Sequence, residues 1–151
     1  MSPNHPAPAF LSSLVAYLVV VAAVGGLILD RAIFATDWIG GGVQVLAAAI
    51  MVWARLTFGL RSFHAPASPT EGGLVTSGPY HILRHPIYAS VLWFLWAAIL
   101  SHPTLRDSLL GAVATGAVAV RIRAEETLLR RRYPEYAAYA ARTRRVIPFV
   151  F

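Results

Sequence analysis

The sequence predicts an all-α integral membrane protein with about four transmembrane helices, followed by helices that lie at the membrane surface. Hydrophobic residues make up 57% of the 151-residue chain and charged residues 13%, which is too apolar for a soluble domain of this size. Apolar runs of roughly spanning length recur up to residue 122, and charged residues gather after it. The length fits a single domain over residues 1–151.

Two apolar runs in the first sixty residues are expected to be the first two spans. Residues 10–29 are uninterrupted and about as long as the ~20 residues that cross a bilayer, and no basic segment or cleavage site of a signal peptide accompanies them. Asp30, Asp37 and three consecutive glycines at 40–42 predict a turn outside the hydrocarbon. Residues 43–60 then return as the second span.

The third and fourth spans follow a connector, residues 61–73, that is too rich in Pro and Gly for a helix. The third span has its apolar part at 87–100 and must begin near Tyr80 to reach a spanning length. A tight turn at Pro103 leads to the fourth span, 105–122, whose small residues predict close packing against the third.

Two charged helical stretches, 124–132 and 135–142, are expected at the membrane surface after the fourth span. The net charge of +6 comes from thirteen arginines, of which eleven fall on the side of the membrane that holds both termini. The positive-inside rule therefore predicts cytoplasmic termini, most simply in a bacterial inner membrane. The same bias explains the charge without nucleic-acid binding, since no base-reading motif accompanies it.

Two polar clusters interrupt the apolar pattern. The first, residues 74–88, holds a Gly-Pro turn, two tyrosines, two histidines and an arginine, all rich in hydrogen-bonding groups. The second, residues 121–126, has the sequence RIRAEE and closes the fourth span. A hairpin of spans three and four would bring both clusters to one membrane surface, so we expect the active site where they meet.

Four elements follow one another in the second half of the chain: residues 74–80 (LVTSGPY), 84–88 (RHPIY), 125–126 (EE), and 133–136 (YPEY) with 147–149 (IPF). Together they resemble the isoprenylcysteine carboxyl methyltransferase family, whose wider relatives include phospholipid N-methyltransferases. The resemblance implies a multi-span enzyme that transfers a methyl group from S-adenosylmethionine to a lipophilic acceptor. The cofactor would lie at the cytoplasmic face, between the motif loop and the C-terminal helix.

The resemblance also implies roles for individual residues of the motif-bearing part, 72–151. Arg121 would hold the methyl acceptor. At Gly72 the better-known members carry a polar side chain, so only backbone contacts are expected from this position. The cofactor contacts would come from Gly72, Gly73, Leu74, Val75, Tyr80, His85, Pro86, Ile87, Tyr88 and Glu125.

The chemistry of methyl transfer is consistent with these assignments. An in-line displacement requires that acceptor and methyl group be aligned and water excluded, and little acid–base catalysis is needed. A carboxylate acceptor is already ionised near neutral pH, and Arg121 can orient it with two parallel hydrogen bonds. Arg121 and Glu125 lie four residues apart, so they can also simply pair with each other.

Other residues of the clusters admit structural roles. Glu126 is expected to pair with Arg130 on the helix surface, which leaves Glu125 to the cofactor. The ring of His85 either bonds the backbone at a helix start or contacts the cofactor. Pro86 is expected to begin a helix whose first N–H groups are open to an anion such as the cofactor carboxylate. The histidines lack metal-ligand spacing, so no metal site is expected.

Several functions remain open at this point. Carboxyl O-methylation of an isoprenylcysteine-like acceptor ranks first, ahead of N-methylation of a phospholipid amine and S-methylation of a thiol. A non-catalytic membrane scaffold is the alternative from another class. A reductase ranks last, because the sequence shows no dinucleotide-binding fingerprint. The apolar spans carry no readable code for the acceptor, and the oligomeric state stays open.

Overall fold

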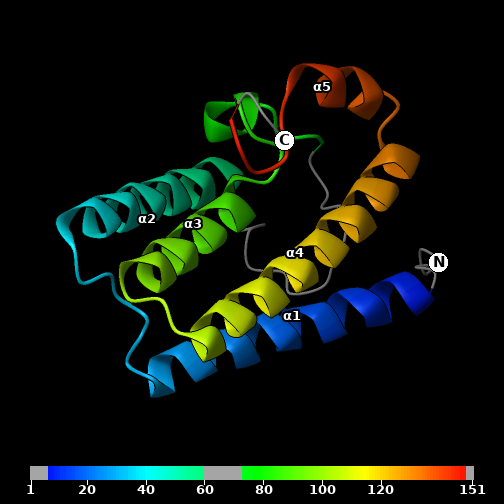
Figure 1. The fold of residues 1–151 in the computed structure, drawn as a ribbon. Coiled ribbons are helices and arrows are strands. Elements are labelled where there is room, and N and C mark those ends of the chain that lie inside the picture. The colour runs from blue at the N-terminus through cyan, green and yellow to red at the C-terminus, as the bar shows by residue number, and fades with distance from the viewer. Residues whose placement is uncertain (1–6, 60–72, 149–151) are drawn as a thin grey trace.

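The computed structural model describes residues 7–59 and 73–148, and within these ranges its regular elements are all helices, with no β-strand. Figure 1 shows the helices in order along the chain. Two of them, over Leu11–Leu29 and Trp38–Phe58, are long and apolar enough to cross a membrane, so the expectation of four spans is supported for two. The elements are α1 (Ala7–Leu29), α2 (Trp38–Phe58), the 3-10 helix η2 (Gly78–His81), α3 (Pro86–Ser101), α4 (Leu105–Arg132) and α5 (Tyr136–Arg142).

The helices pack in two pairs, α1 along α4 and α2 along α3 (Figure 1). The expected hairpin of α3 and α4 is present, but these two helices touch less extensively than either pair. They pack closely at Gly111, where a Cβ would lie 2.6 Å from Cδ1 of Ile99. Nearby, Nε1 of Trp96 donates to Oγ1 of Thr115 at 3.0 Å. The end of α1 and the start of α4 are joined by an ion pair of 2.8 Å between Asp30 and Arg106.

The second helix begins earlier than the sequence predicted. The glycines at 40–42 belong to its first turns and not to a turn outside it, because Asp37 caps the helix and accepts a hydrogen bond from the Gly40 amide at 2.8 Å. Gly40 also packs closely against α3, where an added Cβ would lie 3.1 Å from the Ala97 carbonyl oxygen. Deeper in α2, Nε2 of Gln44 donates to the carbonyls of Ile33 at 2.9 Å and Phe94 at 3.1 Å.

The third helix begins at Pro86, and the expectation that it extends back to Tyr80 is wrong. The backbone just before Pro86 forms hydrogen bonds with the C-terminal segment instead of continuing a helix. The amide of Arg84 donates to the Arg144 carbonyl at 2.6 Å, and that of His85 to the Arg145 carbonyl at 3.1 Å. The resulting helix has 16 residues and a length of about 24 Å, shorter than a bilayer core.

The fourth helix continues without a break from Leu105 to Arg132, so the charged stretch 124–132 extends it and is not a separate helix. It ends before Pro134, and α5 follows, as expected, with its first residue at Tyr136.

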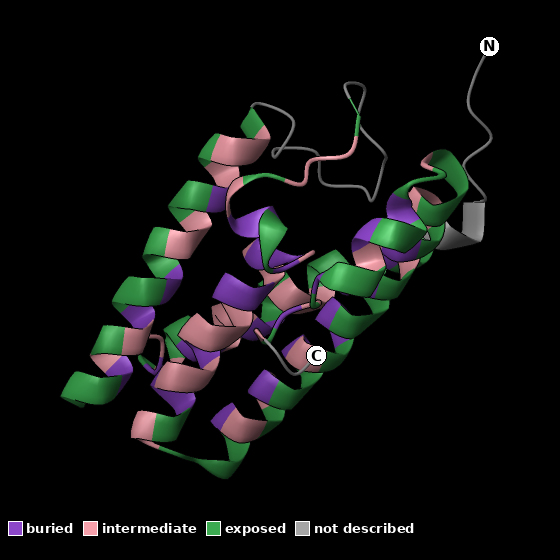
Figure 2. Ribbon diagram, turned by 90° about the horizontal axis from the view of Figure 1, so that it is seen from above, coloured by how far each residue is buried: buried purple, intermediate pink, exposed green. Residues whose placement is uncertain are grey.

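Buried residues occur along all four long helices and also in η2, α5 and the loops beside them; Figure 2 colours the buried segments purple. They form two hydrophobic clusters. The first, which includes Leu27 and Ile99, fills the end near the α3–α4 turn, and the second, which includes Val118 and Ile122, lies beneath the polar residues of α4. Large apolar side chains such as Leu18, Val45 and Leu56 stay exposed on α1 and α2, as expected for helices in contact with lipid.

Candidate active site

The two polar clusters meet in the structure, as the sequence predicted. The hydroxyl of Tyr88, in the first turn of α3, donates to the carboxylate of Glu125 on α4. Nε of Arg121 donates to the same hydroxyl at 2.9 Å. Nδ1 of His85 lies 3.6 Å from Oε2 of Glu125, and its Nε2 lies 3.4 Å from Oε1 of Glu126. The start of α3 and one turn of α4 therefore form a single polar group, which we call the polar junction: His85, Tyr88, Arg121, Glu125 and Glu126.

Arg121 is buried in this junction, with 6% of its surface exposed. Besides the Tyr88 hydroxyl, it donates from Nη1 to the Ser13 carbonyl at 2.9 Å, and its Nη2 lies 3.7 Å from Glu125. Its guanidinium carbon lies 5.4 Å from the ring centre of Tyr17 and 5.6 Å from that of Tyr88. Residues of α1, α3 and α4 thus fix the orientation of the Arg121 guanidinium. Helical spacing alone predicted only its pairing with Glu125.

Glu126 is not a surface residue paired with Arg130, and that expectation is wrong. Its side chain is 6% exposed and accepts hydrogen bonds from Nε of Arg84 at 3.0 Å and from Nη2 of Arg145 at 3.2 Å. Arg130 instead lies over the ring of Tyr136, 5.4 Å from its centre. The return of the C-terminal segment across α4 buries Glu126, and helical spacing carries no information about that return.

The electrostatics of Glu126 follow from these partners. Burial raises the pKa of its carboxyl, but hydrogen bonds from His85 and Arg145 and the charges of His85 and Arg84 outweigh burial and lower that pKa to about 2. Glu126 is therefore ionised at neutral pH and stabilises the cations that surround it.

Arg84 is a residue whose importance the sequence alone did not reveal. Its Nη1 donates to the carbonyls of Ala140 at 2.6 Å and Thr143 at 2.7 Å, while its Nε holds Glu126. It therefore ties the end of α5 to α4. Its place in the Arg-His-Pro-Ile-Tyr element was the only available signal.

The predicted cofactor residues before α3 lie in an irregular segment and in η2. Gly72 falls outside the described residues. Gly73 has a φ of 85°, a conformation that favours glycine, and the half-buried Leu74 and Val75 follow it. Tyr80 is buried, and its carbonyl accepts from the Tyr139 hydroxyl at 2.7 Å.

The pKa of the Tyr80 hydroxyl is raised well above its ordinary value, first by burial and then by the charges of Tyr139 and Glu125. Its ring packs on Phe58, with 5.6 Å between ring centres. The pKa of Tyr139 is likewise raised to about 12, chiefly by burial.

The start of α3 has no side-chain cap. Pro86 is its first residue, and the His85 side chain caps none of the N–H groups that follow, including those of Ile87 and Tyr88. Among the described residues the His85 ring contacts two carboxylates, so the alternative in which it bonds the backbone is wrong. No group of three or more potential metal ligands occurs in the described part of the chain.

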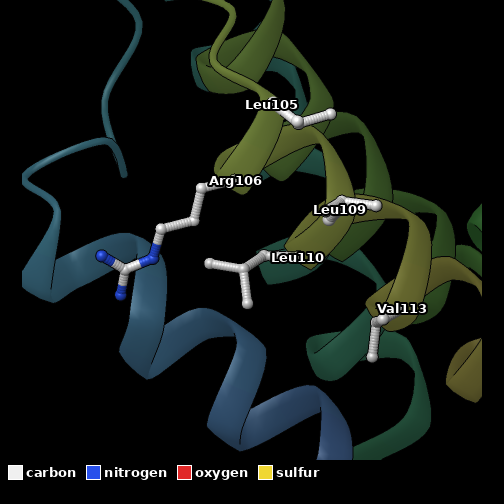
Figure 3. A pocket seen from close by; sticks show the side chains of 5 residues that line it. All are labelled: Leu105, Arg106, Leu109, Leu110 and Val113. Carbon is white, nitrogen blue, oxygen red and sulfur yellow. The ribbon is translucent and has the colours of Figure 1, made fainter.

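An open groove of about 430 Å³ lies elsewhere, at the opposite end of α4. Figure 3 shows Arg106 and Leu110 of its lining reaching from α4 toward α1. The remaining lining residues, Leu105, Leu109 and Val113, are apolar, so the groove offers no chemistry for a reaction.

Comparison with known proteins adds two findings. A family model described as phospholipid methyltransferase matches residues 35–136, a range that contains all of the polar junction and begins after α1. Over 76 residues the chain is 34% identical to the cobalt-zinc-cadmium resistance protein CzcN of Cupriavidus metallidurans, a match that covers 50% of this chain and 35% of that protein. The chain therefore matches about a third of the length of this curated relative. No solved structure matches the chain.

Proposed function

Because this chain belongs to the phospholipid methyltransferase family, a group of membrane enzymes with lipid-type substrates, we propose that it transfers a methyl group from S-adenosylmethionine to a lipophilic acceptor. The observation that carries the proposal is the polar junction, in which an arginine, a carboxylate and a helix start lie together. A non-catalytic scaffold would need no such concentration of buried polar groups, which are costly to bury.

The residues present fit S-adenosylmethionine. When bound, this cofactor supplies a sulfonium-activated methyl group for attack by a nucleophile. Glu125, whose side chain is 23% exposed, is an acceptor suited to amino or ribose hydroxyl groups. The uncapped N–H groups at the start of α3 suit a carboxylate. Cofactor contacts are proposed for these groups and for Gly73, Leu74, Val75, Tyr80 and His85.

The residues of the chain would act mainly by positioning. The Tyr88 hydroxyl bridges Glu125 and Arg121. A cofactor bound by the Glu125 carboxylate and an acceptor bound by the Arg121 guanidinium would therefore be held at a fixed distance and orientation. The hydrophobic cluster beneath them, which includes Val118 and Ile122, keeps water from this side of the junction. Neither role requires a proton transfer by the protein.

We propose carboxyl O-methylation of an isoprenylcysteine-like acceptor as the specific reaction. Arg121 supports it, since a buried guanidinium with fixed orientation matches a carboxylate geometrically and electrostatically. N-methylation of a phospholipid amine is the second candidate. The match to the phospholipid methyltransferase family favours it, and so does Glu125, which could partner an ammonium head group.

Arg121→Lys tests the carboxylate proposal. The charge stays, but the planar fork is lost, so kcat/KM for N-acetyl-S-farnesylcysteine should fall at least about tenfold while the dissociation constant of S-adenosylmethionine stays within about twofold. Arg123→Lys, an exposed position two residues away, is the matched control. If Arg121→Lys and Arg123→Lys turn over this acceptor like the wild type, the carboxylate proposal fails and the amine acceptor takes precedence.

A further inference from the structure

The first helix reaches into the polar junction, although no motif in the sequence pointed to it. The Ser13 carbonyl accepts from Nη1 of Arg121 at 2.9 Å, and the Tyr17 ring lies one turn further along the same face. Both residues belong to α1, which precedes the range 35–136 that the family model matches. The contacts join residues more than a hundred positions apart in the chain.

The guanidinium of Arg121 lies near the rings of both Tyr17 and Tyr88. The distances from its central carbon to the two ring centres are 5.4 Å and 5.6 Å, within the range of a cation–π contact. Tyr88 is itself fixed by its hydrogen bond to Glu125. Tyr17 has no such anchor on α4, and 41% of its surface is exposed. The Tyr17 ring is therefore, beside the Ser13 carbonyl, a contact through which α1 holds the guanidinium.

We propose that α1 is a working part of the acceptor site and that Tyr17 is a positioning residue for Arg121. The inference rests on the function proposed above, in which Arg121 holds the acceptor. Without the Tyr17 ring, the guanidinium loses one of its flanking contacts. It then turns toward Glu125, now 3.7 Å away, and forms a closer ion pair that competes with an acceptor carboxylate.

The kinetic test compares Tyr17→Leu, Tyr17→Phe and the control Leu18→Ala, which lies on α1 with 56% of its surface exposed. Tyr17→Leu should raise KM for N-acetyl-S-farnesylcysteine about two- to fivefold, the size of a partly exposed cation–π contact, and leave the dissociation constant of S-adenosylmethionine unchanged. Tyr17→Phe keeps the ring and should restore the wild-type KM. The control should match the wild type. A phenylalanine variant as impaired as the leucine variant would overturn the proposal.

A second measurement needs no substrate. In detergent micelles the unfolding equilibrium is measured for the wild type, Tyr17→Leu, Arg121→Gln and the double variant. The proposal expects a coupling between the two positions of about two- to fivefold in the equilibrium constant. Additive effects would overturn it. If the two positions are coupled but the wild-type protein transfers no methyl group, the contact between Tyr17 and Arg121 stands and only the proposed function is refuted.

Discussion

Glu125 and Glu126 are neighbours in the chain, yet the structure gives them opposite environments. Glu125 stays partly exposed beside Tyr88 and Arg121, whereas Glu126 is buried against Arg84 and Arg145. Helical spacing predicted a division of labour between them, but it placed Glu126 on the surface. The partners that bury Glu126 come from the motif loop and from the C-terminal segment, and neither is within one helical turn of it.

Substitution of each glutamate should separate binding from stability. Glu125→Gln should weaken S-adenosylmethionine binding by roughly 1.5 to 3 kcal/mol, the loss of one charged hydrogen bond, with little change in stability. Glu126→Gln should reduce the free energy of unfolding by roughly 3 kcal/mol, because it leaves the largely buried Arg84 and the partly exposed Arg145 without their counter-charge. Calorimetric titration and denaturation in detergent measure the two quantities. Equal effects of both variants on either quantity would contradict these assignments.

The stability contributed by Glu126 should depend on pH. Its pKa in the folded chain, about 2, lies below the ordinary value of 4.5, so its contribution is complete above about pH 4.5 and is lost as the pH falls toward 2. Denaturation of the wild type at several acidic pH values should show this loss, and Glu126→Gln should show a shallower dependence. Parallel curves for the two proteins would mean that Glu126 does not carry the effect.

At the scale of elements, the sequence predicted the order of the helices better than their ends, and it divided α4 into two helices where the structure has one. Apolar length predicted α1 and α2, and Pro86 correctly marked the start of α3. The extension of α3 back to Tyr80 failed, because the backbone of residues 82–85 bonds the C-terminal segment. The glycines at 40–42 suggested a turn, whereas Asp37 caps a helix that includes them.

Gly40 gives a test of the α2–α3 contact. In Gly40→Ala the new Cβ would lie 2.6 Å from the Ala35 Cβ and 3.1 Å from the Ala97 carbonyl oxygen, neither of which can rotate away. We expect a loss of about 1 to 3 kcal/mol in the free energy of unfolding. Gly42→Ala is the matched control, since nothing lies within 4 Å of its added Cβ, and it should stabilise the helix by about 0.5 to 1 kcal/mol. Thermal denaturation measures both changes. If both variants changed the stability in the same direction, the close packing at Gly40 would be contradicted.

For the whole molecule, the sequence predicted the meeting of the two polar clusters, because their order and the membrane pattern left few ways to arrange them. It did not predict that α1 packs along α4 and supplies contacts to Arg121. The spans carry no motif, and apolar side chains alone do not specify which helix lies beside which. The roles of the site residues stay predictions.

The membrane orientation can be tested because the chain contains no cysteine. Ala141→Cys lies after the candidate site and Thr36→Cys lies between α1 and α2, both at exposed positions. The arginine distribution predicts that a membrane-impermeant maleimide labels Ala141→Cys only from the cytoplasmic side and Thr36→Cys only from the opposite side. Sealed inverted vesicles expose the cytoplasmic side to the reagent, and right-side-out vesicles expose the opposite side. If both cysteines were labelled in the same kind of vesicle, this orientation would be refuted.

The most direct measurement is the fate of a labelled methyl group. Purified protein is incubated with methyl-labelled S-adenosylmethionine, total lipid extract, N-acetyl-S-farnesylcysteine and phosphatidylethanolamine vesicles, with Glu125→Gln as the comparison. We expect label in the lipid phase with the wild type and much less with the variant, and alkali should release it as methanol if the product is a carboxyl methyl ester. Folded wild-type protein that binds the cofactor yet leaves the lipid phase unlabelled would show that this chain is not a methyltransferase for these acceptors.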